Sequence, residues 1–360
     1  MTDTLLAPGA TIGILGGGQL GRMLAVAAAR LGLHAHIFDP AAEAPAAELA
    51  RRSTRAAWDD ADALADFAAA VDVVTYEFEN VPLATIDILE PLVSVRPGRA
   101  ALAASQDRLH EKRFLKGLGL STAPFAPVDS PADIEAAVAE TGLPAILKTR
   151  RMGYDGKGQA RVGTAAEAAA ALAGMGAASA ILEGVVAFER EVSVIAARGA
   201  DGAVAAFDPG ENQHEGGILR RTTVPANLSS ARRADAVLIA GRILNALDYI
   251  GVLGVEMFVT AGGLVVNEIA PRVHNSGHWT MNACAVDQFE QHIRAIAGWP
   301  IGNGRRHADA EMLNLIGDEV HAAHAHARHP DAAIHLYGKS GVRPGRKMGH
   351  VNFLRPLQGG

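Results

Sequence analysis

The stretch Gly254–His278, GVEMFVTAGGLVVNEIAPRVHNSGH, contains the pattern that decides the fold around the candidate site. Two apolar segments flank Ala261-Gly262-Gly263, which predicts a β-hairpin with a three-residue turn. Counting outward from that turn gives three cross-strand pairs: Thr260 with Leu264, Phe258 with Val266, and Glu256 with Glu268. The hairpin therefore places two glutamates directly opposite each other.

Two carboxylates that face each other in a mostly buried sheet repel one another unless a cation lies between them. Mg²⁺ suits this pair, because it binds one or two carboxylates and completes its coordination with nucleotide phosphate oxygens. The alternative is that one glutamate points to solvent or pairs with Arg272. The hairpin pattern alone does not choose between the two.

The composition of the chain is that of an ordinary globular protein. Its 360 residues allow two or three compact domains, with 49% hydrophobic residues, 20% charged residues and a net charge of -6. No nucleic-acid partner is expected, because basic residues form no long block and aromatic residues are only 5%. The single Cys284 excludes an internal disulfide and fits a reducing compartment. Without a signal segment or an apolar run of about 20 residues, we expect a cytoplasmic protein with no membrane partner.

Strand and helix patterns alternate through the first hundred residues, which predicts an α/β domain with a parallel sheet. The expected elements are strands at Thr11–Leu15, His34–Phe38 and Val71–Tyr76, a helix ending near Leu31, and a helix over Arg99–Leu118. An α+β pattern follows, with expected strands at Ala145–Lys148, Ala180–Glu183, Glu191–Ala197 and Ala203–Phe207, a helix over Ala231–Leu247, and a tail of strand and loop from Met312 to Phe353. We therefore expect domains at 1–100, 101–300 and 301–360.

A glycine loop, Gly16-Gly17-Gly18-Gln19-Leu20-Gly21, lies between the first strand and the first helix. It matches the dinucleotide pattern, and Asp39 ends the next strand where a ribose-binding acid would lie. Taken alone, this points to NAD. The loop geometry requires only an anion at its amides, so another phosphate-bearing ligand or a purely structural turn remains open.

Two acidic and amide side chains follow the third strand. Glu77 and Asn80 lie at the carboxyl edge of the expected sheet, where they could face a sugar or an amine. The alternative is that Asn80 is a helix N-cap before Val81-Pro82.

Lys148 ends a strand and is followed by the glycine loop Gly153–Gly158, a pattern typical of a phosphate clamp and its lid. No Walker A pattern is present, and an exposed loop with solvated lysines is the alternative. Glu183–Val186 ends another strand and could offer backbone groups to an adenine edge. His214 lies in a polar loop, but a lone histidine is usually structural.

In this order, these segments resemble the ATP-grasp superfamily, and most closely its N5-carboxyaminoimidazole ribonucleotide synthetase family. The resemblance covers nearly the whole chain and is carried by GGGQLGRML, YEFENV, QDRLHEKRFL, GYDGKGQ, ENQHEGGIL, NEIAPRVHNSGHWT and YGKSGVRPGRKMGHVN. It implies an ATP-grasp fold similar to that of biotin carboxylase, with an N-terminal Rossmann-like pre-ATP-grasp domain, a lid at about 121–187 and a C-terminal domain. It also implies a homodimer.

The resemblance implies that ATP phosphorylates bicarbonate to carboxyphosphate, which carboxylates the exocyclic amine of 5-aminoimidazole ribonucleotide without biotin. Because the chain shows no fused mutase domain, a separate mutase is expected to act on the product. The competing hypotheses are another ATP-grasp ligase, such as formate-dependent glycinamide ribonucleotide transformylase, an NAD-dependent dehydrogenase, and a nucleotide-sensing protein without turnover. YEFENV and HNSGH favour the carboxylating enzyme.

The resemblance also implies roles for individual residues, with ATP and Mg²⁺ as cofactors. The implied ATP-binding set is Arg108, Lys148, Gly153, Tyr154, Asp155, Gly156, Lys157, Gly158, Gln159, Glu183, Gly184, Val185, Val186, Glu191, His214, Asn267 and Glu268. Glu256 and Glu268 would bind Mg²⁺, and Gly18, Gln19, Leu20, Glu77 and Asn80 would bind the ribonucleotide. The implied catalytic set is Asp155, Arg272, His274, Asn275, Lys339 and Arg346. The family often has an acidic residue where this chain has Ser340-Gly341-Val342, which leaves the charge balance near Lys339 open.

Overall fold

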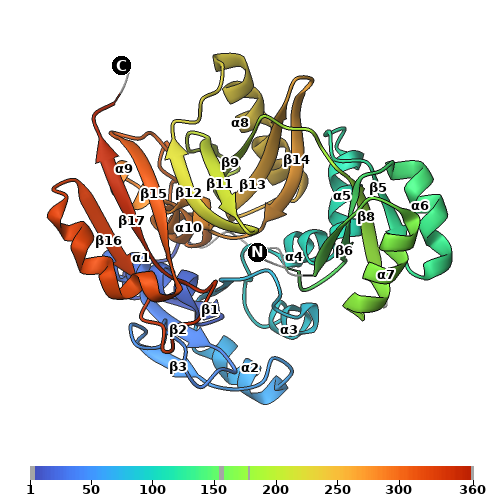
Figure 1. Cartoon of the computed structure of the whole chain (residues 1–360). Coiled ribbons are helices and arrows are strands. Elements are labelled where there is room, and N and C mark those ends of the chain that lie inside the picture. Colours follow the sequence, from blue (N-terminus) through green and yellow to red (C-terminus); the bar gives the residue numbers. More distant parts are fainter. Residues whose placement is uncertain (1–4, 154–157, 177–178, 358–360) are drawn as a thin grey trace.

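The computed structural model describes residues 5–153, 158–176 and 179–357, which form three β-sheets with helices packed on them (Figure 1). The N-terminal sheet has the order β3-β2-β1-β4, and all of its strand pairs are parallel. Its elements are β1 (Thr11–Leu15), α1 (Gln19–Arg30), β2 (His34–Phe38), β3 (Arg52–Thr54), α2 (Ala61–Ala69), β4 (Val73–Tyr76) and α3 (Leu83–Leu89). The predicted α/β domain with a parallel sheet is confirmed.

The single helix expected over Arg99–Leu118 is wrong, because the structure has two helices there. These are α4 (Arg99–Ser105) and α5 (Arg108–Gly117). Asp107 between them has an extended backbone, and its carboxylate accepts the amides of Leu109 and His110. Asp107 is therefore the N-cap of a new helix, a start signal lying inside an otherwise continuous helical pattern.

The second sheet belongs to a small antiparallel lobe, at the right of Figure 1. Its elements are β5 (Phe125–Val128), a 3₁₀ turn (Pro131–Asp133), α6 (Ile134–Thr141), β6 (Ala145–Thr149), β7 (Gln159–Val162), α7 (Ala165–Met175) and β8 (Ala180–Gly184). Leu147 and Leu182 pack in one cluster with Ala168 and Leu172 of α7. Because side chains alternate along a strand, Lys148 and Glu183 lie on the opposite face of this sheet.

The third sheet has nine strands and holds most of the remaining chain. Its elements and the helices beside them are β9 (Arg190–Arg198), β10 (Val204–Ala206), β11 (Gly210–Glu215), β12 (Ile218–Val224), α8 (Ser230–Ala246), β13 (Gly251–Thr260), β14 (Gly263–Ala270), a 3₁₀ turn (Asn275–Gly277), α9 (Thr280–Ala283), α10 (Gln288–Ile296), β15 (Asp309–Ile316), a 3₁₀ segment (Gly317–Arg328), β16 (Ala332–Leu336) and β17 (Lys347–Arg355). The order is β14-β13-β9-β11-β12-β15-β17-β16, with β10 beside β9. The tail strands therefore extend the same sheet as β9–β14.

A shared core joins the N-terminal sheet to the large sheet. Leu24 of α1, Phe289 of α10 and Val252 of β13 belong to one buried cluster. Thr75 at the end of β4 also hydrogen-bonds His292 of α10 at 2.8 Å. The carboxyl ends of β1 and β4 are thus held beside the large sheet.

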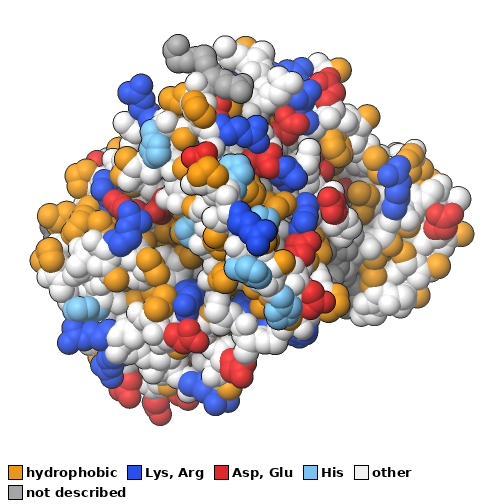
Figure 2. Space-filling model, turned by 60° about the vertical axis from the view of Figure 1, so that its left-hand side comes forward, with side chains coloured by type: hydrophobic (Ala, Val, Ile, Leu, Met, Phe, Trp, Pro, Cys, Tyr) orange, Lys and Arg blue, Asp and Glu red, His pale blue; other side chains and the backbone are white. Residues whose placement is uncertain are grey.

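The surface view in Figure 2 shows basic, acidic and histidine side chains interspersed over the face that it presents. Among the helices of the described ranges, none combines the length and the apolar character that a membrane crossing requires.

Candidate active site

The hairpin of β13 and β14 exists, but its turn differs from the prediction. Thr260 pairs with Gly263, so the turn has two residues, and the expected pairs Thr260–Leu264 and Phe258–Val266 are wrong by one residue. A β-bulge then corrects the offset. Met257 pairs with Val266 and Glu256 pairs with Glu268, which leaves Asn267 as the extra residue. The opposed glutamates are confirmed. The count predicted them only because its two errors cancel: it assumed a turn one residue too long and omitted the bulge.

The two carboxylates of this pair have pKa values shifted in opposite directions. Burial, followed by the charge of Glu268, raises the pKa of Glu256 to about 7. Burial alone would also raise the pKa of Glu268, but Arg108 and Lys148 lower it. Arg108 Nη1 lies 3.1 Å from Glu268 Oε2. The pair therefore concentrates negative charge, which Arg108 and Lys148 offset at Glu268 and which His214 and Lys347 offset less fully at Glu256.

The surroundings of the pair fit a divalent cation completed by a ligand. Arg272 pairs with Glu79, so the alternative in which Arg272 neutralises one of the opposed glutamates is wrong. No group of three or more His, Cys, Asp or Glu side chains within the described ranges is arranged as a metal cage. A cation at Glu256 and Glu268 would therefore need outside oxygens, as Mg²⁺ takes from nucleotide phosphates.

Two lysines from different elements converge on one carboxylate beside this pair. Lys148 Nζ lies 3.0 Å from Glu183 Oε2, and Lys112 Nζ of α5 lies 3.4 Å from the same oxygen. Lys148 is only 8% exposed, so the alternative of a solvated lysine is wrong for it. Glu183 Oε1 is buried and has no hydrogen-bond partner among the described residues. The cluster thus holds surplus positive charge and a buried carboxylate oxygen without a hydrogen-bond partner among the described residues.

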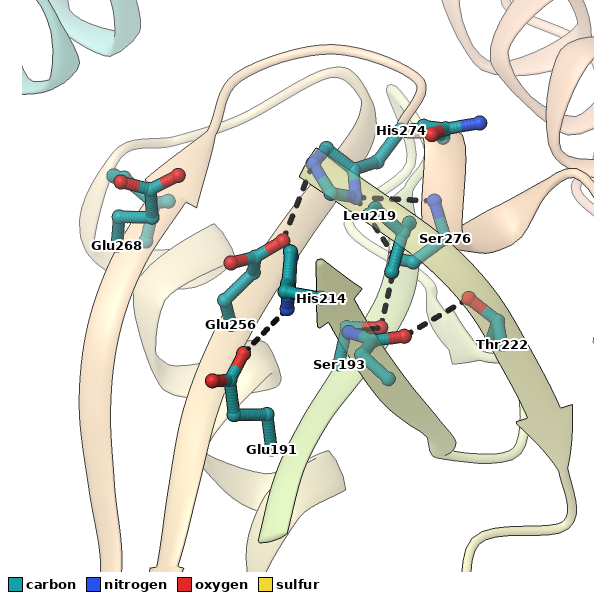
Figure 3. Close-up of polar contacts among 12 residues, drawn as sticks. Glu191, Ser193, His214, Leu219, Thr222, Glu256, Glu268, His274 and Ser276 are labelled. Atoms are coloured by element: carbon teal, nitrogen blue, oxygen red, sulfur yellow. Dashed lines mark hydrogen bonds and ion pairs between the residues drawn. The ribbon is translucent and has the colours of Figure 1, made fainter. Parts of the chain in front are cut away.

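The neighbouring face of the large sheet carries polar and aromatic groups suited to a nucleoside. Glu191 Oε2 of β9 lies 2.6 Å from His214 Nδ1 of β11, and burial is offset by this contact, so the pKa of His214 is raised (Figure 3). Phe188 stacks on Phe258 with ring centroids 4.7 Å apart. A β-bulge lies between Gln213 and His214.

His274 ends a chain of hydrogen bonds that the sequence analysis missed. Its Nδ1 lies 2.8 Å from Ser276 Oγ, which in turn contacts Ser193 Oγ at 2.7 Å. Asn212 donates to Ser193 and accepts from Thr222, and His274 Nε2 lies 3.5 Å from Glu256 Oε1 (Figure 3). Burial, then Arg272, lowers the pKa of His274 to about 3, so the ring is neutral. Only the resemblance indicated this histidine, because the three partner elements are distant in sequence.

The glycine loop receives anions, but these are carboxylates of the protein itself. Gly18 and Gly21 donate their amides to the two oxygens of Glu77 at 2.5 and 2.6 Å, and Gly17 donates to Asp39 at 2.6 Å. A phosphate at these three amides would have to displace both carboxylates. The NAD interpretation is weakened as well, because Asp39, the expected ribose-binding acid, already accepts the Gly17 amide. Contact of Gly18, Gln19 and Leu20 with a substrate stays a prediction.

Lys339 and Arg346, two more of the predicted residues, lie in the loop between β16 and β17. Lys339 donates to the carbonyl of Lys347 at 2.7 Å and lies over the Tyr337 ring. Arg346 donates to the carbonyls of Ser340 and Gly341 at 2.5 and 2.7 Å. Those carbonyl oxygens are neutral acceptors, so they satisfy the Arg346 donors without supplying the negative charge of an acidic residue.

Contacts across the chain bring this loop to the N-terminal domain. Ser340 hydrogen-bonds Glu43.

Asn275 exchanges amide hydrogen bonds with Asn314 at 2.9 and 2.7 Å. Asn80 is not the N-cap of α3, since Pro82 holds that position, so that alternative is wrong. The predicted Tyr154, Asp155, Gly156 and Lys157 lie outside the described residues.

Comparison with known protein families gives three matches along the chain. Residues 9–106 match the ribonucleotide synthetase preATP-grasp domain, and residues 113–289 match the ATP-grasp domain. Residues 310–358 match the phosphoribosylaminoimidazole carboxylase C-terminal domain.

Similar proteins and solved structures cover almost the entire chain. The N5-carboxyaminoimidazole ribonucleotide synthase of Brucella melitensis is 55% identical over 99% of this chain and 99% of its own. The crystal structure of the synthetase from Thermus thermophilus has a TM-score of 0.90 at 47% identity, covering 96% of this chain and 93% of that one. The Aspergillus clavatus enzyme in complex with ADP and 5-aminoimidazole ribonucleotide has a TM-score of 0.90 at 31% identity, covering 97% and 94%.

Proposed function

This chain belongs to the family of N5-carboxyaminoimidazole ribonucleotide synthases, and we propose that it carboxylates 5-aminoimidazole ribonucleotide with bicarbonate at the expense of ATP. The products are N5-carboxyaminoimidazole ribonucleotide, ADP and phosphate, a step of purine biosynthesis. The observation that carries the proposal is the opposed pair Glu256 and Glu268, bordered by Arg108 and Lys148.

The nucleotide lies between the faces of two antiparallel sheets in this proposal. Lys148 and Arg108 hold the phosphates, since charge-assisted contacts in a shielded site are strong. Glu256 and Glu268 would hold Mg²⁺, which would supply positive charge to the phosphate oxygens of the nucleotide. The unpartnered Glu183 oxygen and the Glu183–Val186 segment, with Glu191 and His214, accept the nucleoside.

The amine substrate and bicarbonate lie toward the N-terminal sheet. A bicarbonate oxygen takes the terminal phosphoryl group of ATP, and the exocyclic amine then attacks the carboxyl carbon as phosphate leaves. Arg272, Lys339 and Arg346 supply positive charge to carboxyphosphate and to the phosphate group of the ribonucleotide. Burial and the charge of Arg272 lower the pKa of His274 to about 3, so its neutral ring is a weak base that contributes a hydrogen bond to Ser276 and no positive charge. The rest of the predicted catalytic set, Asp155 and Asn275, completes the site.

The steady-state test is ADP release measured with each substrate omitted in turn. ADP formation should require both 5-aminoimidazole ribonucleotide and bicarbonate, and ¹³C-bicarbonate should label the product carbamate. ADP release with formate and glycinamide ribonucleotide would favour the transformylase instead. Reduction of NAD, or nucleotide binding without turnover, would support the two other classes.

The assembly and setting of the enzyme follow from the family in this proposal. It is a cytoplasmic homodimer with domains at 1–100, 101–300 and 301–360, and a separate mutase takes its product. Light scattering of the purified protein, which gives its mass in solution, tests the dimer.

A further inference from the structure

Two consecutive residues of α5 form hydrogen bonds with the backbone of β14 on either side of Glu268. Lys112 Nζ donates to the carbonyl oxygen of Asn267 at 2.6 Å. Glu111 Oε1 accepts the amide of Ile269 at 2.6 Å. Glu111 and Lys112 are 2% and 1% exposed, so both side chains are shielded from water.

These contacts are made at the point where the strand register changes. β14 is the edge strand of the large sheet, and its bulged residue is Asn267. Without the bulge, the two-residue turn would pair Glu256 with Asn267, and Glu268 would lie on the opposite face of the strand. A bulge at an edge has backbone groups that the sheet does not satisfy, so it needs partners from another element.

Lys112 also connects the bulge to the phosphate side of the site. Its ammonium shares Glu183 Oε2 with Lys148. Lys112 thus neutralises part of the Glu183 charge, which would otherwise act on Lys148 only. The same ammonium therefore touches the strand of one carboxylate ligand and the carboxylate partner of the proposed phosphate-binding lysine.

We propose that Glu111 and Lys112 are positioning residues that hold the Asn267 bulge and thereby keep Glu268 opposite Glu256 as a metal ligand. This inference rests on the proposed Mg²⁺–ATP function. Neither residue touches the substrates in it. Figure 3 shows the result of that positioning, with Glu268 and Glu256 on adjacent strands.

The test measures metal binding apart from turnover. Mn²⁺ replaces Mg²⁺ as a paramagnetic probe, and its affinity for the protein–ADP complex is measured by electron paramagnetic resonance. Lys112→Met keeps the apolar stem but removes the ammonium, and we expect it to weaken Mn²⁺ binding by about tenfold or more. Lys112→Arg, which can still donate to Asn267, should recover most of that affinity.

Variants of Glu111 and of Tyr249 separate positioning from general stability. Glu111→Gln keeps an acceptor for the Ile269 amide and should bind Mn²⁺ almost like the wild type, whereas Glu111→Leu should lose affinity as Lys112→Met does. Tyr249→Phe removes another buried hydrogen bond to β13, donated to the Val252 carbonyl at 2.9 Å, so it should lower thermal stability without changing Mn²⁺ affinity.

The outcomes distinguish this inference from the proposed function. If the wild-type protein with ADP binds no Mn²⁺, the metal site itself is wrong. If the wild type binds Mn²⁺ and a folded Lys112→Met or Glu111→Leu variant binds it equally well, the positioning role of Glu111 and Lys112 is overturned. If neither variant folds, Glu111→Asp decides, because it keeps the carboxyl group but shortens its reach to the Ile269 amide. A lower Mn²⁺ affinity than that of Glu111→Gln supports the positioning role, and an equal affinity overturns it.

Discussion

At the scale of single residues, Lys148 is a buried cation whose pKa is lowered by burial and restored in part by Glu183. Its positive charge is most useful against phosphate, because few water molecules screen it there. We expect Lys148→Ala to weaken ATP binding by about tenfold to a hundredfold, as loss of a charge-assisted contact does. Isothermal titration with ATP measures the change. Lys116→Ala, at an exposed site of the adjoining helix, is the control and should leave the affinity unchanged.

Glu256 and Glu268 should behave as one unit because they share one cation. Removing either carboxylate leaves the metal undercoordinated, so Glu256→Gln and Glu268→Gln should each abolish most activity, and the double variant should be little worse. ADP release is measured against Mg²⁺ concentration for the three variants. Independent effects that add in free energy, or one nearly active single variant, would refute the shared site.

At the scale of elements, the glycine loop is held by the carboxylates of Glu77 and Asp39. A Cβ at Gly18 would overlap Glu77 Oε1, so Gly18→Ala must push that side chain out of the loop. We expect the KM for 5-aminoimidazole ribonucleotide to rise while the KM for ATP stays near that of the wild type. Gly117→Ala is the control, because its Cβ would meet no atom within 4 Å.

An equal rise in both KM values would mean that the loop supports the whole fold and not the amine site. Tight binding of NAD by the wild type would contradict the interpretation of the loop altogether.

Elements with local signals were predictable from the sequence, whereas register was not. The strands Thr11–Leu15 and His34–Phe38 match the prediction residue for residue, because each is a short apolar run bounded by turn residues. The helix break at Asp107 was missed, although the residue type is a usual N-cap. The Asn267 bulge depends on Glu111 and Lys112, which lie more than 150 positions away. Counting residue pairs outward from a turn cannot reveal partners that lie so far away in the sequence.

At the scale of the whole molecule, the site draws on residues from all three sheets. The family resemblance indicated most of the proposed site residues, because the order of motifs along a chain can be read from the sequence whereas their geometry cannot. The hydrogen-bonded chain behind His274 was not found, since Ser193, Asn212 and Thr222 meet only once β9, β11 and β12 are paired. The hydrogen bonds from the glycine-loop amides to Glu77 were missed for the same reason. Glu77 reaches the loop from the end of β4, which lies next to β1 in the folded sheet.

Buried histidines make the whole molecule sensitive to acid. Burial lowers the pKa of His292 and of His274 to about 3 and that of His36 to about 4, and it also holds the pKa values of His278 and His350 well below the ordinary value. Each of these rings is neutral in the folded protein, whereas the ordinary pKa of a histidine side chain is 6.5. The unfolded chain therefore binds more protons below pH 6.5, and the stability that these histidines contribute is lost as the pH falls from 6.5 toward 3. Glu111 and Glu256 oppose this trend, because their raised pKa values favour the folded state as the pH falls.

His292→Gln isolates one histidine from these opposing groups. His292 accepts the Val252 amide at 3.0 Å and contacts Thr75, so glutamine should cost stability at pH 7.5. Between pH 7.5 and 5.5 the wild type should lose about 1 kcal/mol more free energy of unfolding than the variant, because the variant has one fewer ring to protonate on unfolding. Urea unfolding at the two pH values measures this difference, and His324→Gln, at an exposed site, is the control and should follow the wild type. Parallel losses in the wild type and His292→Gln would mean that His292 is already charged in the folded protein.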